Sequence, residues 1–186
     1  MGGLIARICQ KYHYKRYFIF KSLLKNEGKN LLDIGCGPPS SSMKDGAFLN
    51  YLGYGQGMDI EPRNINFKFT LGNIEKIPFN DNTFDVVTAS EVIEHIEHPM
   101  QALKEVHRIL KPQGVFVMST PNGNVLFKAM WGLWQVIFGS MWKDTHLSEF
   151  DRKTWIKLIN KSKLFKLEQI NSILNMNLTF KMRRLE

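Results

Sequence analysis

Short apolar segments alternate with amphipathic segments over the first two thirds of this chain. Strand-like runs occupy residues 30–34, 53–60, 66–71, 84–90 and 115–120. The run at 84–90 is apolar almost throughout, which is typical of a parallel strand that is covered on both faces. Helices are expected at 39–52 and 99–110, between the strands. This order predicts an α/β fold, a doubly wound, Rossmann-like, mostly parallel sheet of six to seven strands with helices on both faces.

The amino-terminal region is expected to be helical. Apolar residues at helical spacing predict one or two amphipathic helices over 4–24, ended by Gly28, and therefore a helical cap over 1–28. A chain of 186 residues is long enough for one well-buried core but too short for two ordinary domains. We therefore expect a single domain over 1–186.

The carboxyl-terminal region predicts a helix at 152–163 and strands at 164–170 and 174–182. No clear turn separates the two strands. Either the edge of the sheet is abbreviated or the natural protein is longer.

The motif Asp33-Ile34-Gly35-Cys36-Gly37 follows the first predicted strand. Two glycines one residue apart let the backbone turn sharply and approach a ligand closely, because neither carries a Cβ. The dinucleotide fingerprint Gly-x-Gly-x-x-Gly fails here, since its sixth position is Ser40. The second strand ends at Asp59, 22 residues beyond Gly37, the distance at which one βαβ step brings a carboxylate to a ribose. Considered alone, Asp59 is equally well explained as a solvated turn residue.

Four segments in this order resemble the class I S-adenosylmethionine-dependent methyltransferases, namely 32–37, 57–60, 77–87 and 110–112. The third and fourth segments, together with 94–96 and 119–122, are most similar to the ubiquinone-biosynthesis type of methyltransferase. The resemblance implies that S-adenosylmethionine is the methyl donor and S-adenosylhomocysteine the product. It also implies methyl transfer to an oxygen or nitrogen of a small acceptor, hydrophobic or lipid-linked.

The resemblance also implies roles for single residues. Gly35 and Gly37 would line the methionine part of the cofactor, and Asp59 would accept the ribose hydroxyls. Asn73 stands where the family usually places Asp beside the adenine amine. The end of the fourth strand would lie under the methionine, near the transferred methyl. The implied cofactor-binding residues are Asp33, Gly35, Cys36, Gly37, Asp59, Ile60, Asn73, Ile74, Ser90 and Glu91.

The chain departs from the family pattern after the glycine turn. Pro39 replaces the third glycine, which removes an N–H donor and fixes φ, so the loop is expected to take a different path or to bind less tightly. Gln113 replaces the first glycine of the usual Lys-Pro-Gly-Gly turn. Neither change touches Gly35, Gly37 or Asp59, so cofactor binding is expected to persist.

An apolar segment at 125–142, with three tryptophans and one charge, lies within the region 124–150 where the family often places its substrate cap. It is too short and too interrupted by glycine for a membrane span, which needs about 20 apolar residues. Three roles remain open, namely a cap over a hydrophobic acceptor, a peripheral contact with an anionic membrane, and a buried helix or dimer contact. His146 is the candidate catalytic base, beside the commoner structural role of a lone histidine. His95 suits a capping or packing role.

The net charge of +8 belongs to the two ends of the chain. Residues 1–30 carry seven Lys/Arg against one acid, 31–150 carry nine against thirteen, and 151–186 carry nine against three. Basic flanks attract nucleic acid, membranes or phosphorylated substrates. Without a recognised nucleic-acid motif, a nucleic-acid methyltransferase remains the second hypothesis and a noncatalytic S-adenosylmethionine-binding protein the third. Cys9 and Cys36 are expected to be reduced thiols in a cytoplasmic protein, and no metal site is predicted.

Overall fold

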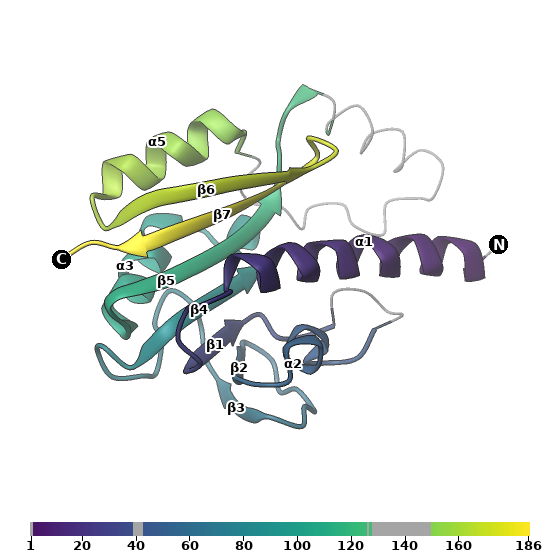
Figure 1. The fold of residues 1–186 in the computed structure, drawn as a ribbon, viewed down its shortest axis with the longest axis horizontal. Coiled ribbons are helices and arrows are strands. Elements are labelled where there is room, and N and C mark those ends of the chain that lie inside the picture. Colours follow the sequence, from purple (N-terminus) through teal and green to yellow (C-terminus); the bar gives the residue numbers. More distant parts are fainter. Residues whose placement is uncertain (1, 39–42, 126, 128–149) are drawn as a thin grey trace.

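The computed structural model describes residues 2–38, 43–125, 127 and 150–186. Within these ranges one seven-stranded sheet is flanked by helices on both faces (Figure 1). The described helices are α1 (Gly2–Leu23), α2 (Ala47–Leu52), η1 (Ile93–His95, a 3₁₀-helix), α3 (Pro99–Ile109) and α5 (Arg152–Ser162). The strands are β1 (Leu31–Ile34), β2 (Gln56–Asp59), β3 (Lys68–Leu71), β4 (Phe84–Ser90), β5 (Leu110–Pro121), β6 (Phe165–Ile173) and β7 (Asn177–Arg184).

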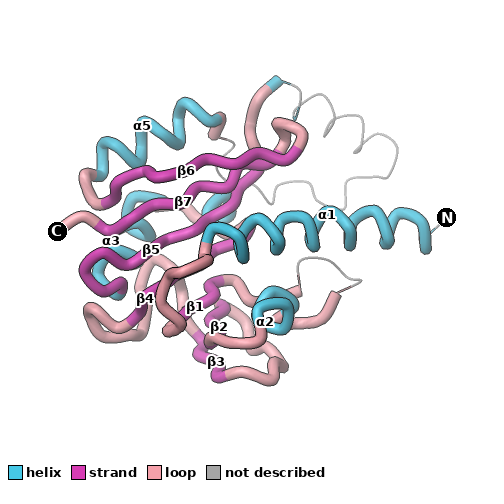
Figure 2. Tube along the Cα trace, in the orientation of Figure 1, coloured by secondary structure: helices cyan, strands magenta, loops and turns pink. Residues whose placement is uncertain are grey.

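The strand order is β3-β2-β1-β4-β5-β7-β6. Strands β1 to β5 pair in parallel, whereas β7 runs antiparallel to both of its neighbours, β5 and β6. Figure 2 shows the strands as one continuous layer. The chain moves from β1 outward to β3 and then returns to β4 on the other side of β1, so the strand order reverses between β1 and β4. Open α/β sheets bind ligands at the carboxyl ends of the strands beside such a reversal.

Two apolar clusters lie on opposite faces of the sheet. Leu31 and Val86 point toward α1 and α2, whereas their neighbours Leu32 and Val87 point toward the face covered by α3 and α5. Successive side chains of a strand alternate between faces, so a strand covered on both sides is apolar at most positions. The predicted doubly wound, mostly parallel sheet is confirmed.

The predicted helix over 39–52 is wrong at 43–46. Helix α2 begins only at Ala47, after Gly46, whose φ is 66°. The Gly46 N–H donates to the carbonyl oxygen of Cys36 at 2.7 Å. The chain here returns to the glycine turn before the helix starts. Pro39, the expected first residue of that helix, lies outside the described residues.

The hairpin between β6 and β7 is complete, so the expectation of an abbreviated sheet edge is wrong. Leu174 and Asn175 form its turn with φ values of 52° and 56°. Positive φ is uncommon for leucine, and hairpin turns are normally signalled by Gly or Asn-Gly, which explains why no turn was predicted. The carbonyl oxygen of Asn175 accepts hydrogen bonds from Nδ2 of Asn122 at 2.9 Å and from Nδ2 of Asn124 at 2.7 Å. These bonds join the turn to the end of β5.

The expected cap over 124–150 falls outside the described residues except at 124, 125, 127 and 150, and His146 falls outside them as well. Among the helices that the structure does describe, none combines the length and the apolar composition needed to cross a membrane.

Candidate functional site

The glycine turn follows β1 directly and is held against β2. The Gly35 N–H donates to the carbonyl oxygen of Met58 at 2.8 Å. Gly35 has a φ of 70°, and a Cβ at this position would lie 2.3 Å from Cγ2 of Val92. Both the left-handed backbone and the close approach of Val92 therefore require glycine here.

Asp59 lies at the carboxyl end of β2 and joins that strand to the glycine turn. Its buried carboxylate accepts the Gly37 N–H on Oδ2 at 3.0 Å and the Glu61 N–H on Oδ1 at 3.0 Å. Oδ1 also accepts from Nη2 of Arg63 at 3.1 Å. A carboxylate has about four lone-pair sites, so one further hydroxyl donor can be accepted without breaking a bond.

Arg63 is a residue of this site that the sequence reasoning missed. Its guanidinium bridges Asp59 and Oε2 of Glu61, the latter at 2.8 Å. A Cβ on Gly37 would lie 2.9 Å from Cζ of Arg63, so the guanidinium also packs against the glycine turn. The available signal was an arginine four residues after the acid, which is a common spacing.

Asp33 is the acid of the glycine motif and is buried within the sheet. Its Oδ1 accepts the hydroxyl proton of Thr88 at 2.7 Å. Burial, partly offset by this hydrogen bond and reinforced by the charge of Asp59, raises the pKa of Asp33 to about 7. Burial of the Cys36 thiol, together with the charges of Asp33 and Asp59, raises the pKa of this thiol to about 12, so Cys36 stays protonated.

The predicted adenine-side residues lie at the ends of β2 and β3. Ile60 is 69% exposed, and Leu71, which pairs with Asp59 in the β-ladder, is 57% exposed. Two exposed apolar side chains next to the acid offer a surface for a planar ring, and Leu71 was not predicted. Oδ1 of Asn73 accepts the Glu75 N–H at 2.8 Å, so this oxygen already closes a local turn. The Ile74 side chain is buried in the core, which leaves only its backbone to face a ligand.

The end of β4 carries a second polar cluster, which we call the Glu91 cluster (Arg16, Ser90, Glu91, Ser119 and Asn177). Oε1 of Glu91 accepts from Oγ of Ser119 at 2.8 Å and from Nδ2 of Asn177 at 2.7 Å. Oγ of Ser90 lies 3.3 Å from Oγ of Ser119. Glu91 has a φ of 57°, a strained conformation for a glutamate. The predicted residues Ser90 and Glu91 are thus tied to β5 and β7.

Arg16 enters the Glu91 cluster from α1 and was also missed by the sequence reasoning. It is 1% exposed, and its Nη1 lies 3.5 Å from Oε2 of Glu91. Nη2 of Arg16 donates to Nδ1 of His13 at 2.9 Å. Burial and the adjacent guanidinium lower the pKa of His13 to about 4, so His13 is neutral and can accept this bond. Burial and the charge of Glu91 raise the pKa of the neighbouring Glu94.

Within 2–38, 43–125, 127 and 150–186, no group of three or more His, Cys, Asp or Glu side chains is arranged to hold a metal ion. His95 lies beside Glu94, with Nε2 4.0 Å from Oε1 of that residue. The site has two parts. The glycine turn with Asp59 lies at the ends of β1 and β2, and the Glu91 cluster lies at the end of β4, which pairs with β1.

A family profile described as a methyltransferase domain matches residues 7–165. The chain is 27% identical over 143 residues to the demethylmenaquinone methyltransferase of Staphylococcus epidermidis, covering 68% of this chain and 59% of that protein. It is 30% identical over 112 residues to the ubiquinone biosynthesis O-methyltransferase of Coxiella burnetii, covering 55% of this chain and 47% of that one. The chain thus spans about half the length of these curated relatives.

Solved structures share the fold. A methyltransferase dependent on S-adenosylmethionine from Thermotoga maritima superposes with a TM-score of 0.68 over 100% of both chains, at 17% sequence identity. Another from Mesorhizobium loti superposes with a TM-score of 0.66 over 88% of this chain and 95% of that chain, at 16% identity. At these identities the superpositions support the fold alone.

Proposed function

Because the chain belongs to the family of class I S-adenosylmethionine-dependent methyltransferases, we propose that it binds S-adenosylmethionine beside the glycine turn and transfers its methyl group to a small acceptor. The family match over residues 7–165 supports the cofactor, which supplies an electrophilic methyl on a sulfonium. The residues of this chain would bind and orient it.

One contact carries the proposal, the 3.0 Å hydrogen bond from the Gly37 N–H to Oδ2 of Asp59. It brings a backbone that a ligand can approach closely and a carboxylate together at the carboxyl ends of the strands, where open α/β sheets bind ligands. Asp59 would accept the ribose hydroxyls, and the exposed Ile60 and Leu71 would contact the adenine. The backbone of the turn at Gly35 and Gly37 would receive the methionine part.

For the acceptor we propose a hydroxylated ring with an apolar substituent. The relatives from Staphylococcus and Coxiella are a demethylmenaquinone methyltransferase and a ubiquinone biosynthesis O-methyltransferase. Menaquinone and ubiquinone are quinones with an apolar tail, and their reduced forms carry two ring hydroxyls. Alignment of nucleophile, methyl and sulfur can lower the barrier of such a displacement by about 7–11 kcal/mol. A general base such as His146 would add about 10²–10⁴-fold when the acceptor is a hydroxyl.

The charges of the carboxyl-terminal flank favour a small acceptor over nucleic acid. Glu27 pairs with Nζ of Lys181 at 2.7 Å and with Nη2 of Arg183 at 2.9 Å. Arg183 also pairs with Glu168. Lys181 and Arg183, two of the nine basic residues at 151–186, thus already pair with acids of the fold, which reduces the charge they offer to phosphates.

The experiment is a transfer assay with methyl-labelled S-adenosylmethionine, in which catechols and hydroquinones with and without an apolar tail are compared with tRNA and duplex DNA. We expect label in the organic extract for at least one tailed ring, and none above background for the Asp59→Ala variant. Label only in nucleic acid would favour the second hypothesis. Cofactor binding without transfer to any acceptor would favour a noncatalytic binding protein.

A further inference from the structure

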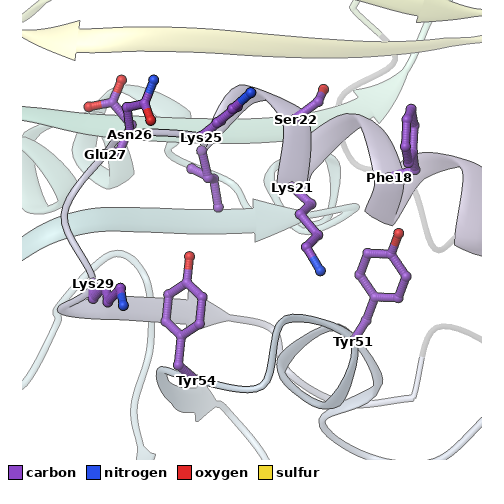
Figure 3. A pocket seen from close by; sticks show the side chains of 10 residues that line it. Phe18, Lys21, Ser22, Lys25, Asn26, Glu27, Lys29, Tyr51 and Tyr54 are labelled. Atoms are coloured by element: carbon purple, nitrogen blue, oxygen red, sulfur yellow. The ribbon is translucent and has the colours of Figure 1, made fainter.

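A pocket of about 530 Å³ lies apart from the glycine turn and the Glu91 cluster, and none of its lining residues belongs to either. It is formed by the end of α1, the following loop and the end of α2 (Figure 3). Lys29 precedes β1 by two residues and Tyr54 precedes β2 by two residues, so the pocket lies at the amino ends of these strands. The proposed cofactor site lies at their carboxyl ends. A ligand in this pocket is therefore not the methyl acceptor.

The pocket carries unbalanced positive charge. Lys21, Lys25 and Lys29 line it, and none of them forms an ion pair with another residue in the described part of the chain. Glu27 is its only acidic lining residue, and that carboxylate is already paired with Lys181 and Arg183 from β7. Hydrogen bonds to both cations lower the pKa of Glu27 against the effect of burial, so the pairing is maintained at neutral pH.

Aromatic side chains stand beside the ammonium group of Lys21. Figure 3 shows Lys21 extending from α1 toward α2, between Tyr51 and Tyr54, and its Nζ lies 5.1 Å from the centroid of the Tyr51 ring. Neither tyrosine hydroxyl has a hydrogen-bond partner among the described residues. Phe18 is 64% exposed at the margin of the pocket. Two free hydroxyl donors and an exposed ring thus accompany the three cations.

We propose that this pocket binds the phosphate group of a ligand whose ring or chain packs against Tyr51, Tyr54 and Phe18. Lysine is a common point-charge partner of phosphate, and tyrosine hydroxyls add donors to its oxygens. The volume lies within the range of small-molecule sites, about 300–1,000 Å³. The same chemistry is offered by a free phosphorylated ring and by the headgroup of a phospholipid.

The probes are inorganic phosphate, phenyl phosphate, and vesicles of phosphatidylcholine with or without phosphatidylglycerol. Binding is measured by calorimetry and vesicle sedimentation with S-adenosylhomocysteine in excess. The test variant is Lys25→Glu with Lys29→Glu. The matched control is Lys153→Glu with Lys157→Glu, which makes the same charge change at exposed positions of α5.

We expect phenyl phosphate to bind more tightly than inorganic phosphate, and the test variant to weaken binding at least about tenfold while the control changes it less than about twofold. Tyr54→Leu should reduce the preference for phenyl phosphate. If only the anionic vesicles bind, and only the test variant loses this binding, the phosphate group belongs to a lipid headgroup. Equal losses in both charge variants, or no saturable binding of any probe, would overturn the proposal, and melting temperatures of the variants check their folding.

Discussion

The two parts of the site differ in how they are assembled. The glycine turn and Asp59 come from segments 22 residues apart, and two of the three donors to Asp59 are backbone N–H groups. The Glu91 cluster instead joins side chains from α1, β4, β5 and β7. Backbone donors are fixed by the local chain path, whereas the second part exists only when distant elements pack correctly. Substitution of Asp59 should therefore mainly affect ligand binding, whereas substitutions in the Glu91 cluster should mainly affect stability.

The largest loss of stability is expected for Arg16→Ala. Breaking a buried ion pair on one side leaves an uncompensated charge, which costs about 3–5 kcal/mol when both partners are fully buried. The Glu91 side chain is 25% exposed, so we expect a decrease of about 2–3 kcal/mol in the free energy of unfolding. Chemical denaturation measures this value. The double variant Arg16→Met with Glu91→Gln should recover part of the loss, and a double variant less stable than Arg16→Ala would contradict the pairing.

Gly35→Ala should follow, with a loss of about 2 kcal/mol or more, since left-handed backbone costs an L-residue roughly 1–2 kcal/mol and Val92 must also move. Gly53→Ala is the matched control, because Gly53 has a φ of 84° but no atom within 4 Å of the position of a Cβ. The difference between the two variants isolates the contact with Val92. Equal losses would mean that the close approach has no energetic consequence.

The raised pKa of Asp33 predicts a pH dependence with a definite sign. S-Adenosylmethionine is cationic, so it should favour the ionised form, and its affinity should rise about tenfold from pH 6 to pH 8. Because the pKa is higher in the folded state than in the unfolded state, the folded protein is favoured below about pH 4, and this contribution is lost as the pH rises through about 7. Titrations and unfolding curves of Asp33→Asn should lack both trends, and a wild-type affinity independent of pH would contradict the assignment.

Arg63→Gln should have the smallest effect. Removing the guanidinium leaves Asp59 with its two backbone donors and frees one lone pair for a ribose hydroxyl. We expect an affinity for S-adenosylhomocysteine that is equal or up to a few-fold higher. A large loss of affinity would instead show that Arg63 holds the acid in position.

The contrast between the two parts also explains what could be predicted from the sequence. The sheet, the glycine turn and Asp59 are encoded by apolar periodicity and by residues that are close along the chain. Arg16 lies 75 positions before Glu91, and nothing in its neighbourhood on an amphipathic helix distinguishes it from a surface arginine. The turn at Leu174 and Asn175 was missed because tertiary bonds from Asn122 and Asn124 support a backbone that the local sequence does not favour. Helix α2 starts later than expected because Gly46 bonds back to Cys36.

The central claim, that the glycine turn and Asp59 bind the cofactor, is tested most directly by calorimetric titration of S-adenosylhomocysteine into the wild-type protein and the Asp59→Ala variant. One further charge-assisted hydrogen bond, from a ribose hydroxyl to Asp59, is worth about 1.5–3 kcal/mol and should make the affinity of the variant roughly 10- to 100-fold lower. The Glu91→Gln variant should stay within about tenfold of wild type, since Gln can still accept from Ser119 and Asn177. Saturable binding to the wild type with this loss in Asp59→Ala is the predicted result. Absence of binding, or equal affinity in the wild type and Asp59→Ala, would contradict the claim.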